Sequence, residues 1–427
     1  MIFVYSYKKS QRLKYTLDVL LKNILQVEYK LVDKATFIAT TKPKINYSEE
    51  DLPATIWIKP HTLLFETDID FQDIRVTHSK GIPYFFKTSD ILDFQFDILA
   101  SAFYMLTRYE EYLPFTPDIH GRFTAIQSLA YTANFLQKPV VHLWAKLLQD
   151  TIVQQHPAYI FPKRDFTQHN TIDIDVAYAC KGKPFWRKTG SIVKKLINFY
   201  YKATWQTVPC TDKDLYDTYD ILKEIQEYSN VNSTYFFQVG KYGKYDKNLP
   251  LNKTMQNLIK RTSSYANIGL HPSYNSNKSI AVLQKEVKNL VKILDKPLIK
   301  SRQHYLKMSL PDTYENLITV GIQEDYTMGF ADQIGFRSGM ALPYPFFNLN
   351  RNEQRPLSIV PFQIMDGTLK DYLKLTPDEA TLEIQTIKKA VQDVNGQLVT
   401  VFHNSFLIDK DEWKGWLAVY SALFDRE

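Results

Sequence analysis

Two aspartates stand two positions apart in a stretch of β-branched residues, Thr171-Ile172-Asp173-Ile174-Asp175. In a strand, alternate side chains point to the same face, so both carboxylates would point the same way. Two carboxylates side by side are unfavourable unless something pairs them. A metal ion bound by one would leave the other nearby as an ionised proton acceptor, as in hydrolytic metal sites. The alternative interpretation is a strand end whose acids cap a turn.

Strands and helices alternate after this stretch, and polar side chains follow several expected strands. His271 follows a strand ending at Leu270, Arg302 follows one that starts near Leu298, and His403 follows one over 398–402. In a barrel of parallel strands, these ends lie on one face, where loops build the functional site. Each histidine alone could be a buried structural residue. Their joint placement at strand ends favours a site.

The length of 427 residues is too great for one ordinary core, so we expect two domains. The first, residues 1–165, opens with a strand over 2–7 and a helix that Ser10 caps, which indicates a smaller α/β domain. A long helix is expected over 91–109. A stretch rich in proline and charge, Phe161-Pro162-Lys163-Arg164-Asp165, ends this domain. The second domain, residues 166–427, is expected to carry the strand ends described above.

The chain from about Phe166 to Asn404 resembles the polysaccharide deacetylase superfamily, the metal-dependent carbohydrate esterases of NodB homology and carbohydrate esterase family 4. The resemblance rests on five motifs in order: Thr171 to Asp175, Ser233 to Phe237, Gly269 to Ser273, Arg302 to Tyr305, and Phe402-His403. It implies an α/β fold with a distorted (β/α)7 barrel. Residues 1–165 resemble only an uncharacterised N-terminal region of some bacterial members.

The resemblance also implies a metal site. It assigns Asp175 and His271 as ligands, and places the third ligand at Asn275, where the family usually has a second histidine. An amide is a weaker ligand, so His304, which replaces the usual proline of its motif, is an alternative ligand or a substrate contact. The expected ion is a divalent metal, most simply zinc, with cobalt or nickel as alternatives.

The same resemblance implies the catalytic roles. Asp173 would be the general base, with Arg302 orienting it. The backbone N–H of Tyr305 would stabilise the oxyanion of the tetrahedral intermediate. His403 would protonate the leaving group and therefore needs a neighbouring carboxylate, for which Asp325 is a candidate.

Arg337 lies in Gly335-Phe336-Arg337-Ser338-Gly339, where the family's tryptophan-containing motif has no evident counterpart. We interpret it as a contact to an anionic sugar, or else as a surface charge. The function expected is removal of N- or O-linked acetyl groups from a sugar or glycan precursor. The alternatives are a glycan-binding or assembly protein that has lost efficient metal chemistry, and a glycosidase that uses Asp173 with a distant carboxylate.

Charge and hydropathy bear on the partners and the location. A net charge of +6 is mild for this length, and the charges are mostly interspersed, so nucleic-acid binding is not expected. No secretory signal and no membrane-spanning run is evident. With two cysteines, Cys180 and Cys210, and no Cys-x-x-Cys pair, we expect reduced thiols in a cytoplasmic protein.

One basic segment is an exception. Residues between Cys180 and Cys210 include seven cations, no acid and several aromatic rings: Lys181, Lys183, Arg187, Lys188, Lys194, Lys195 and Lys202 among Phe185, Trp186, Phe199, Tyr200, Tyr201 and Trp205. It is either a solvated helix or a lid that binds an anionic glycan or an anionic membrane surface. The second interpretation would place the protein peripherally at the inner membrane surface.

Overall fold

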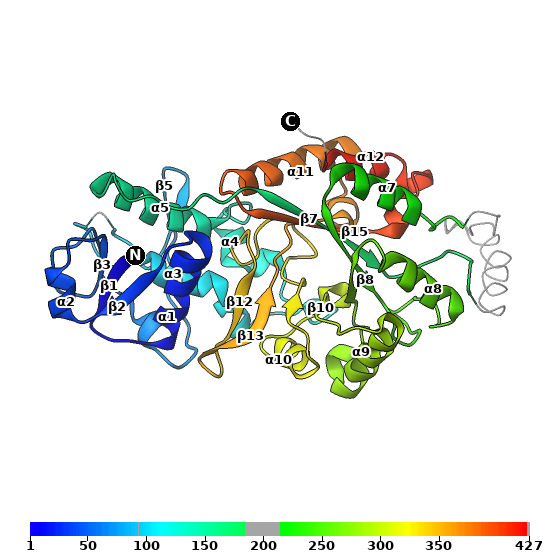
Figure 1. Ribbon diagram of the computed structural model, residues 1–427, viewed down its shortest axis with the longest axis horizontal. Coiled ribbons are helices and arrows are strands. Elements are labelled where there is room, and N and C mark those ends of the chain that lie inside the picture. The colour runs from blue at the N-terminus through cyan, green and yellow to red at the C-terminus, as the bar shows by residue number, and fades with distance from the viewer. Residues whose placement is uncertain (93, 184–213, 425–427) are drawn as a thin grey trace.

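The computed structural model describes residues 1–92, 94–183 and 214–424 of the chain. Figure 1 shows the N-terminal part, in blue and cyan, beside a larger part that runs from green to red. Helices α11 (Pro377–Gln392) and α12 (Trp416–Ala422), near the end of the described chain, lie on the larger part. The chain is an α/β protein, as expected.

The N-terminal part is built on a small parallel sheet in the order β2-β1-β3-β4. Its strands are β1 (Ile2–Ser6), β2 (Tyr29–Val32), β3 (Lys44–Tyr47) and β4 (Ile56–Ile58). Helix α1 (Gln11–Leu17) begins after Ser10, whose hydroxyl accepts a hydrogen bond from the Leu13 N–H, so the expected cap is present. The helix continues as a π-helix, η1 (Asp18–Ile24), and α2 (Lys34–Ala39) follows β2.

Helix α3 (Ile98–Leu106) is shorter than expected. Asp97 accepts hydrogen bonds from the N–H groups of Leu99 and Ala100, which starts the helix there, and Ile91 is exposed. The prediction of a helix from residue 91 was therefore wrong. Apolar residues at helical spacing also occur before Asp97, outside the helix that this residue caps. The other elements of this part are η2 (Thr62–Phe65), β5 (Thr77–Ser79), β6 (Ile82–Tyr84), η3 (Tyr109–Tyr112), η4 (Ala125–Gln127), α4 (Leu129–Thr132) and α5 (Val140–Gln155).

The larger part is a mostly parallel sheet in the order β12-β13-β11-β10-β9-β8-β7-β15-β14. Its strands are β7 (Thr167–Ile174), β8 (Asn232–Phe237), β9 (Asn267–Leu270), β10 (Lys300–Ser301), β11 (Glu324–Asp325), β12 (Tyr344–Asn348), β13 (Glu353–Ile359), β14 (Ile364–Met365) and β15 (Gln397–His403). The stretch 353–365 pairs with β11 through β13 and with β15 through β14, which closes the sheet into a ring. Within the described residues, eight of the nine strands run parallel, and β12 is antiparallel to β13. Because β13 and β14 belong to one stretch of chain, the ring has seven positions. The prediction of a distorted seven-stranded barrel is confirmed.

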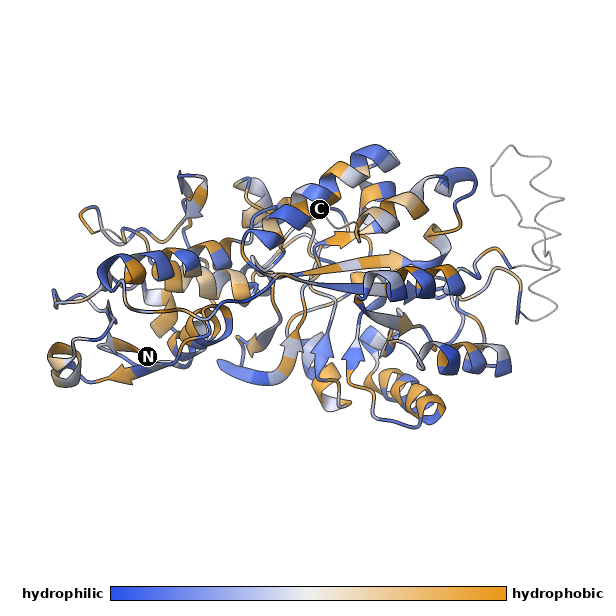
Figure 2. Cartoon of the chain, turned by 45° about the horizontal axis from the view of Figure 1, so that its top comes forward, coloured by the Kyte–Doolittle hydropathy of each residue, from blue (hydrophilic) through white to orange (hydrophobic). Residues whose placement is uncertain are grey.

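Helices cover the outside of the ring, and the inside holds a small apolar cluster together with buried polar side chains such as Arg302. The helices are α7 (Tyr219–Ser229), α8 (Lys253–Thr262), α9 (Ile280–Leu294), α10 (Asp312–Thr319), α11 and α12, with short turns η5 (Ser276–Lys278), η6 (His304–Leu306), η7 (Thr368–Tyr372), η8 (Asn404–Phe406) and η9 (Asp411–Trp413). Along β15, Leu398 and Phe402 join the large core, whereas Val399 and Val401 join a separate small cluster. Alternate residues of the strand thus face its two sides. In Figure 2 one long central strand is largely hydrophobic, other strands are hydrophilic, and hydrophilic residues are frequent along the outer helices.

The two parts pack against each other closely. Buried Tyr15 of α1 donates a hydrogen bond to the Pro345 carbonyl at 2.8 Å, and Arg12 binds the Asn352 side chain. Apolar residues of both parts belong to one large buried cluster. The division near residue 165 remains a prediction, and the structure shows that residues on either side of it share a core.

Two further features bear on the expectations about membrane spans and cysteines. Among the described residues, no helix is both long enough and apolar enough to cross a membrane. Cys180 is disulfide-bonded, so the prediction of reduced thiols was wrong for this residue.

Candidate metal centre and catalytic site

Three strands of the ring carry the key side chains at their carboxyl ends. Asp173 lies on β7 opposite His403 of β15, and Asp175 follows β7 directly. His271 follows β9, which pairs through β8 with β7. Because the carboxyl ends of parallel strands meet at one edge, residues more than 200 positions apart in sequence become neighbours. The sequence-based expectation of a shared face is thus met by the geometry.

Asp175 is the centre of the site. Its Oδ1 lies 3.0 Å from His271 Nε2, and its Oδ2 lies 3.3 Å from His304 Nε2. One ligand atom from each of these three residues lies within 4.8 Å of the others, so the group could hold a metal ion. Carboxylate oxygen and imidazole nitrogen are the ligands that zinc and similar divalent ions prefer.

The hydrogen bond of His271 sets its protonation pattern. Its Nδ1 lies 2.6 Å from the Arg302 carbonyl, which can only accept, so Nδ1 carries a hydrogen. Its Nε2 faces Asp175 Oδ1 at 3.0 Å. A metal ion between these two atoms would have an imidazole nitrogen and a carboxylate oxygen as ligands, a donor set that suits zinc.

His304 is held in a similar way. Its Nδ1 lies 2.9 Å from Asp246 Oδ1, and Gln238 Nε2 contacts both groups. Burial lowers the pKa of His304, but the negative charges of Asp175 and Asp246 outweigh burial and raise it to about 9. Conversely, although burial acts to raise the pKa of Asp175, His304 and His271 hold it well below its usual range. Asp175 is therefore ionised across the physiological range.

Asp173 and Arg302 form a buried pair beside this cluster. Arg302 Nη1 donates to Asp173 Oδ1 at 2.8 Å, and the guanidinium packs 4.6 Å from the Phe236 ring. Arg302 also donates through Nε to the Tyr326 carbonyl. The second oxygen of Asp173 faces His271 Nε2 at 3.7 Å. The orientation of Asp173 by Arg302, implied by the resemblance, is present in the geometry.

His403 pairs with a carboxylate that was not foreseen. Its Nδ1 lies 2.8 Å from Asp366 Oδ1, and its backbone N–H donates to Asp366 Oδ2. Burial lowers the pKa of His403, but Asp366, assisted by Asp175, raises it to about 10. His403 Nε2 lies 3.7 Å from Asp175 Oδ2, so this cationic ring borders the metal cluster.

Asp325, the expected partner of His403, lies elsewhere. Its carboxylate accepts hydrogen bonds from Ser301 and from the hydroxyl and N–H of Thr327. It therefore shapes the turn after β11, and the assignment to His403 was wrong. Asp366 was missed because strand β14 before it has only two residues. The signal that could have found it is a polar residue directly after an apolar stretch, as at the other strand ends.

Arg337 also requires a correction. It is buried, its Nε donates to Glu111 Oε1 at 2.9 Å, and its Nη1 donates to the Gly329 carbonyl. A second bond, from Nη2, reaches the other oxygen of Glu111. All three nitrogens are thus used within the protein, and Arg337 is an ion pair between the N-terminal part and the barrel rather than a contact to a sugar.

Asn275 and Tyr305 lie near the cluster in sequence but differ in setting. Asn275 is exposed and lines a hollow of about 590 Å³ with Ser273, Glu286 and residues of α9. Tyr305 follows His304 in the turn η6 with φ of 60°, and its carbonyl accepts a hydrogen bond from Arg122. The roles of Asn275 as a ligand and of the Tyr305 N–H as an oxyanion donor remain predictions.

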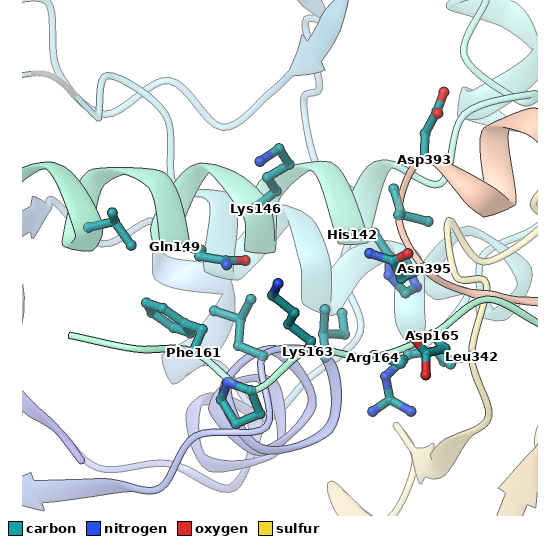
Figure 3. Close-up of a pocket in the computed structure, with 15 residues that line it drawn as sticks. His142, Lys146, Gln149, Phe161, Lys163, Arg164, Asp165, Leu342, Asp393 and Asn395 are labelled. Atoms are coloured by element: carbon teal, nitrogen blue, oxygen red, sulfur yellow. The ribbon is translucent and has the colours of Figure 1, made fainter. Parts of the chain in front are cut away.

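Most of the basic segment between Cys180 and Cys210 lies outside the described residues, which stop at 183 and resume at 214. The membrane-surface prediction therefore stays a prediction. Another hollow, of about 470 Å³, lies between α5 and the linking segment that carries Phe161, Lys163 and Arg164 (Figure 3). Its lining includes His142, Lys146 and Gln149 of α5 but no residue of the predicted site.

Comparison with known proteins gives a family match for the N-terminal part and distant structural likenesses for the barrel. Residues 2–157 match a family of unknown function, DUF7033. No curated protein matches the chain. A protein assigned as a polysaccharide deacetylase from Mycobacterium smegmatis is 13% identical, with 63% of this chain and 87% of that chain covered at a TM-score of 0.40.

Two other solved structures show the same distant likeness. One assigned as a polysaccharide deacetylase from Pseudomonas aeruginosa PAO1 is 11% identical, with 62% of this chain and 87% of that chain covered at a TM-score of 0.36. A CE4 family pseudoenzyme from Bacillus anthracis is 10% identical, with 61% of this chain and 60% of that chain covered at a TM-score of 0.31. The chain thus has distant structural similarity to CE4 polysaccharide deacetylases over about 61% of its length.

Proposed function

We propose that this protein is a metal-dependent hydrolase that removes acetyl groups from nitrogen or oxygen of a carbohydrate or glycan precursor. The observation that supports this most is the placement of His271 and His304 Nε2 against Asp175, with each Nδ1 at an oxygen acceptor. Histidines that bind metals are typically held in this way. A bound divalent ion, most simply zinc, with cobalt or nickel as alternatives, would polarise the acetyl carbonyl and activate water.

Asp173 is the proposed general base. Arg302 occupies its Oδ1, which leaves Oδ2 directed toward the ligand atom of His271 at 3.7 Å. The guanidinium is itself buried and bound to the Tyr326 carbonyl, so it cannot swing away from Asp173. Arg302 therefore fixes the direction of the acceptor oxygen.

His403 is the proposed general acid. The Asp366 carboxylate holds the proton on Nδ1 and raises the pKa of the ring to about 10, so the ring is protonated at neutral pH. Its Nε2 faces the centre of the site and can give its proton to the departing amine or alcohol. The Tyr305 N–H, one residue beyond His304, is the proposed donor to the oxyanion.

Metal binding is the direct test. Titration calorimetry with zinc, cobalt and nickel should show one site in the wild-type protein and none in Asp175→Ala. Removal of a charged ligand lowers metal affinity more than a change in a residue that only supports a ligand. His304→Ala should weaken binding at least tenfold. Asn275→His should leave the affinity unchanged if His304 is the third ligand, and should raise it if Asn275 is.

Acetate release from a panel of N- and O-acetylated glycans then tests the reaction. The alternative is a glycan-binding or assembly protein on the same barrel, which the asparagine at 275 favours. The buried pairs Asp173–Arg302 and His403–Asp366 count against it, because a binding site has no need of both a fixed base and a fixed acid. Glycan binding without acetate release in the metal-loaded protein would select the alternative.

A further inference from the structure

A turn of the N-terminal part reaches the candidate metal site. Asp118 organises this turn, since its Oδ1 accepts hydrogen bonds from the N–H groups of His120 and Arg122, each at 2.9 Å. Gly121 completes the turn with φ of 80°, a conformation that favours glycine. The turn 118–122 lies in the sequence far before the barrel, yet it contacts the barrel at residue 305.

Arg122 makes the central contact. Its Nη1 donates to the Tyr305 carbonyl at 2.8 Å, its Nε binds Asp118 Oδ2 at 2.7 Å, and its Nη2 donates to the Tyr372 hydroxyl at 3.1 Å. The side chain is only 11% exposed. Because each of the three nitrogens makes a hydrogen bond, the guanidinium is fixed in place.

The segment that Arg122 holds is conformationally unfavourable. Tyr305 and Leu306 have φ of 60° and 51°, in the left-handed region that residues with side chains rarely adopt. The residue before them, His304, points Nε2 at Asp175. A shift in this turn would therefore move both a candidate ligand and the candidate oxyanion donor.

His120 adds a second contact from the same turn. Its ring lies 4.7 Å from the Tyr305 ring, and its Nδ1 lies 3.3 Å from the Tyr274 hydroxyl. Tyr305 in turn packs 4.5 Å from the His304 ring. An unbroken series of ring contacts thus leads from the N-terminal part to the candidate ligand.

We infer that the turn 118–122 completes the candidate metal site, with Arg122 as the positioning residue that holds the His304–Tyr305 turn in its active conformation. The inference rests on the proposed function and assigns the N-terminal part a task in it. Arg122 acts through the Tyr305 carbonyl, so its removal should change the geometry of His304 and Tyr305 without removing any ligand.

Hydrogen–deuterium exchange tests the positioning without any metal or substrate. In Arg122→Ala, amides of the peptide covering 302–307 should exchange at least tenfold faster than in the wild type, and Arg122→Lys should recover part of the protection. Tyr15→Phe is the matched control, because it also removes one side-chain bond from the N-terminal part to a barrel carbonyl, that of Pro345. It should leave the exchange of 302–307 unchanged.

Cobalt binding and kinetics test the consequence. Arg122→Ala should weaken Co²⁺ binding about tenfold or more and alter the visible absorption of the bound ion, and Tyr15→Phe should do neither. With an acetylated glycan, kcat should fall more than KM rises, because an oxyanion donor acts mainly in the transition state.

The outcomes separate this inference from the proposed function. If wild-type protein binds Co²⁺ and Arg122→Ala matches Tyr15→Phe in exchange, affinity and kinetics, the inference is overturned and the function stands. If wild-type protein binds no metal, the proposed function fails, and faster exchange in Arg122→Ala alone would still show that Arg122 holds the turn. If Arg122→Ala does not fold, Arg122→Lys decides by the same exchange measurement.

Discussion

At the scale of single residues, the site is defined by what holds each side chain in place. His271, His304 and His403 each place Nδ1 at an oxygen atom, and each directs Nε2 toward Asp175. The oxygen differs: a backbone carbonyl holds the first, and buried carboxylates hold the other two. The carboxylate of Asp366 raises the pKa of His403 to about 10, which suits that ring to the role of a general acid.

Asp173→Asn should retain the metal and lose at least about 100-fold in turnover, because it removes the proton acceptor but no ligand. Metal content and acetate release, measured on the same preparation, check this. Asp165→Asn, at an exposed position, is the control. Wild-type turnover in Asp173→Asn would exclude Asp173 as the base.

Asp366→Asn should shift the pH dependence of the reaction. Asp366 raises the pKa of His403 to about 10, and activity needs the protonated ring, so activity is lost as pH rises through that pKa. Without the carboxylate, the alkaline limb of kcat/KM should move down by about one pH unit or more. The apparent values will belong to the coupled site. An unmoved alkaline limb would remove His403 from the acid role.

At the scale of elements, buried charges join the N-terminal part to the barrel. Glu111, at the end of η3, accepts hydrogen bonds from Arg108 Nε at 2.7 Å and from Arg337 Nε at 2.9 Å. Burial would raise the pKa of Glu111, but Arg337 and Arg108 lower it overall, so the carboxylate is ionised. These elements are therefore fixed by charge pairing as well as by apolar contact.

Glu111→Gln should destabilise the fold by about 3 to 5 kcal/mol, because it leaves the buried Arg337 guanidinium without its counter-charge, whereas Arg108 keeps Glu110. Urea denaturation monitored by circular dichroism measures the free energy of unfolding. Asp150→Asn removes the exposed pair of Asp150 with Lys146 and should cost less than about 1 kcal/mol. A similar small cost for both variants would show that Glu111 is not a structural centre of this interface.

At the scale of the whole molecule, the acid limit of stability should depend on His142. This buried residue of α5 accepts a hydrogen bond at Nε2 from the Ala341 N–H of the barrel at 3.1 Å. Burial, with a smaller effect of Arg164, lowers its pKa to about 3. The unfolded chain, with an ordinary pKa near about 6.5, therefore takes up the proton first as the pH falls. Stability present above pH 6.5 is lost progressively toward pH 3.

His142→Gln should reduce this pH dependence, because glutamine keeps an acceptor but does not titrate. Between pH 7.5 and 5, the loss of unfolding free energy should be smaller in the variant by about 2 kcal/mol. Urea denaturation at both pH values measures it, with exposed His78→Gln as the control. An equal loss in wild type and variant would place the acid sensitivity at other groups.

The sequence alone determined the alternation of strands and helices and the polar residues at the strand ends, because these are local signals, whereas the barrel was implied by the resemblance to the deacetylases. Asp173, Asp175, His271, Arg302 and His403 were all identified from these local signals, and the structure brings them together. Helix starts were less certain, as α3 shows, because one capping aspartate overrides an apolar spacing that continues beyond it.

Only the tertiary structure decided which carboxylate each histidine meets and what the N-terminal part contacts. Asp246 and Asp366 reach His304 and His403 from 58 and 37 positions away in sequence, and Arg122 reaches Tyr305 from 183 positions away. Arg337 likewise became an interface ion pair through Glu111, 226 positions before it. Such pairings depend on how the ring of strands closes and how the two parts pack. The local spacing of residues predicts neither.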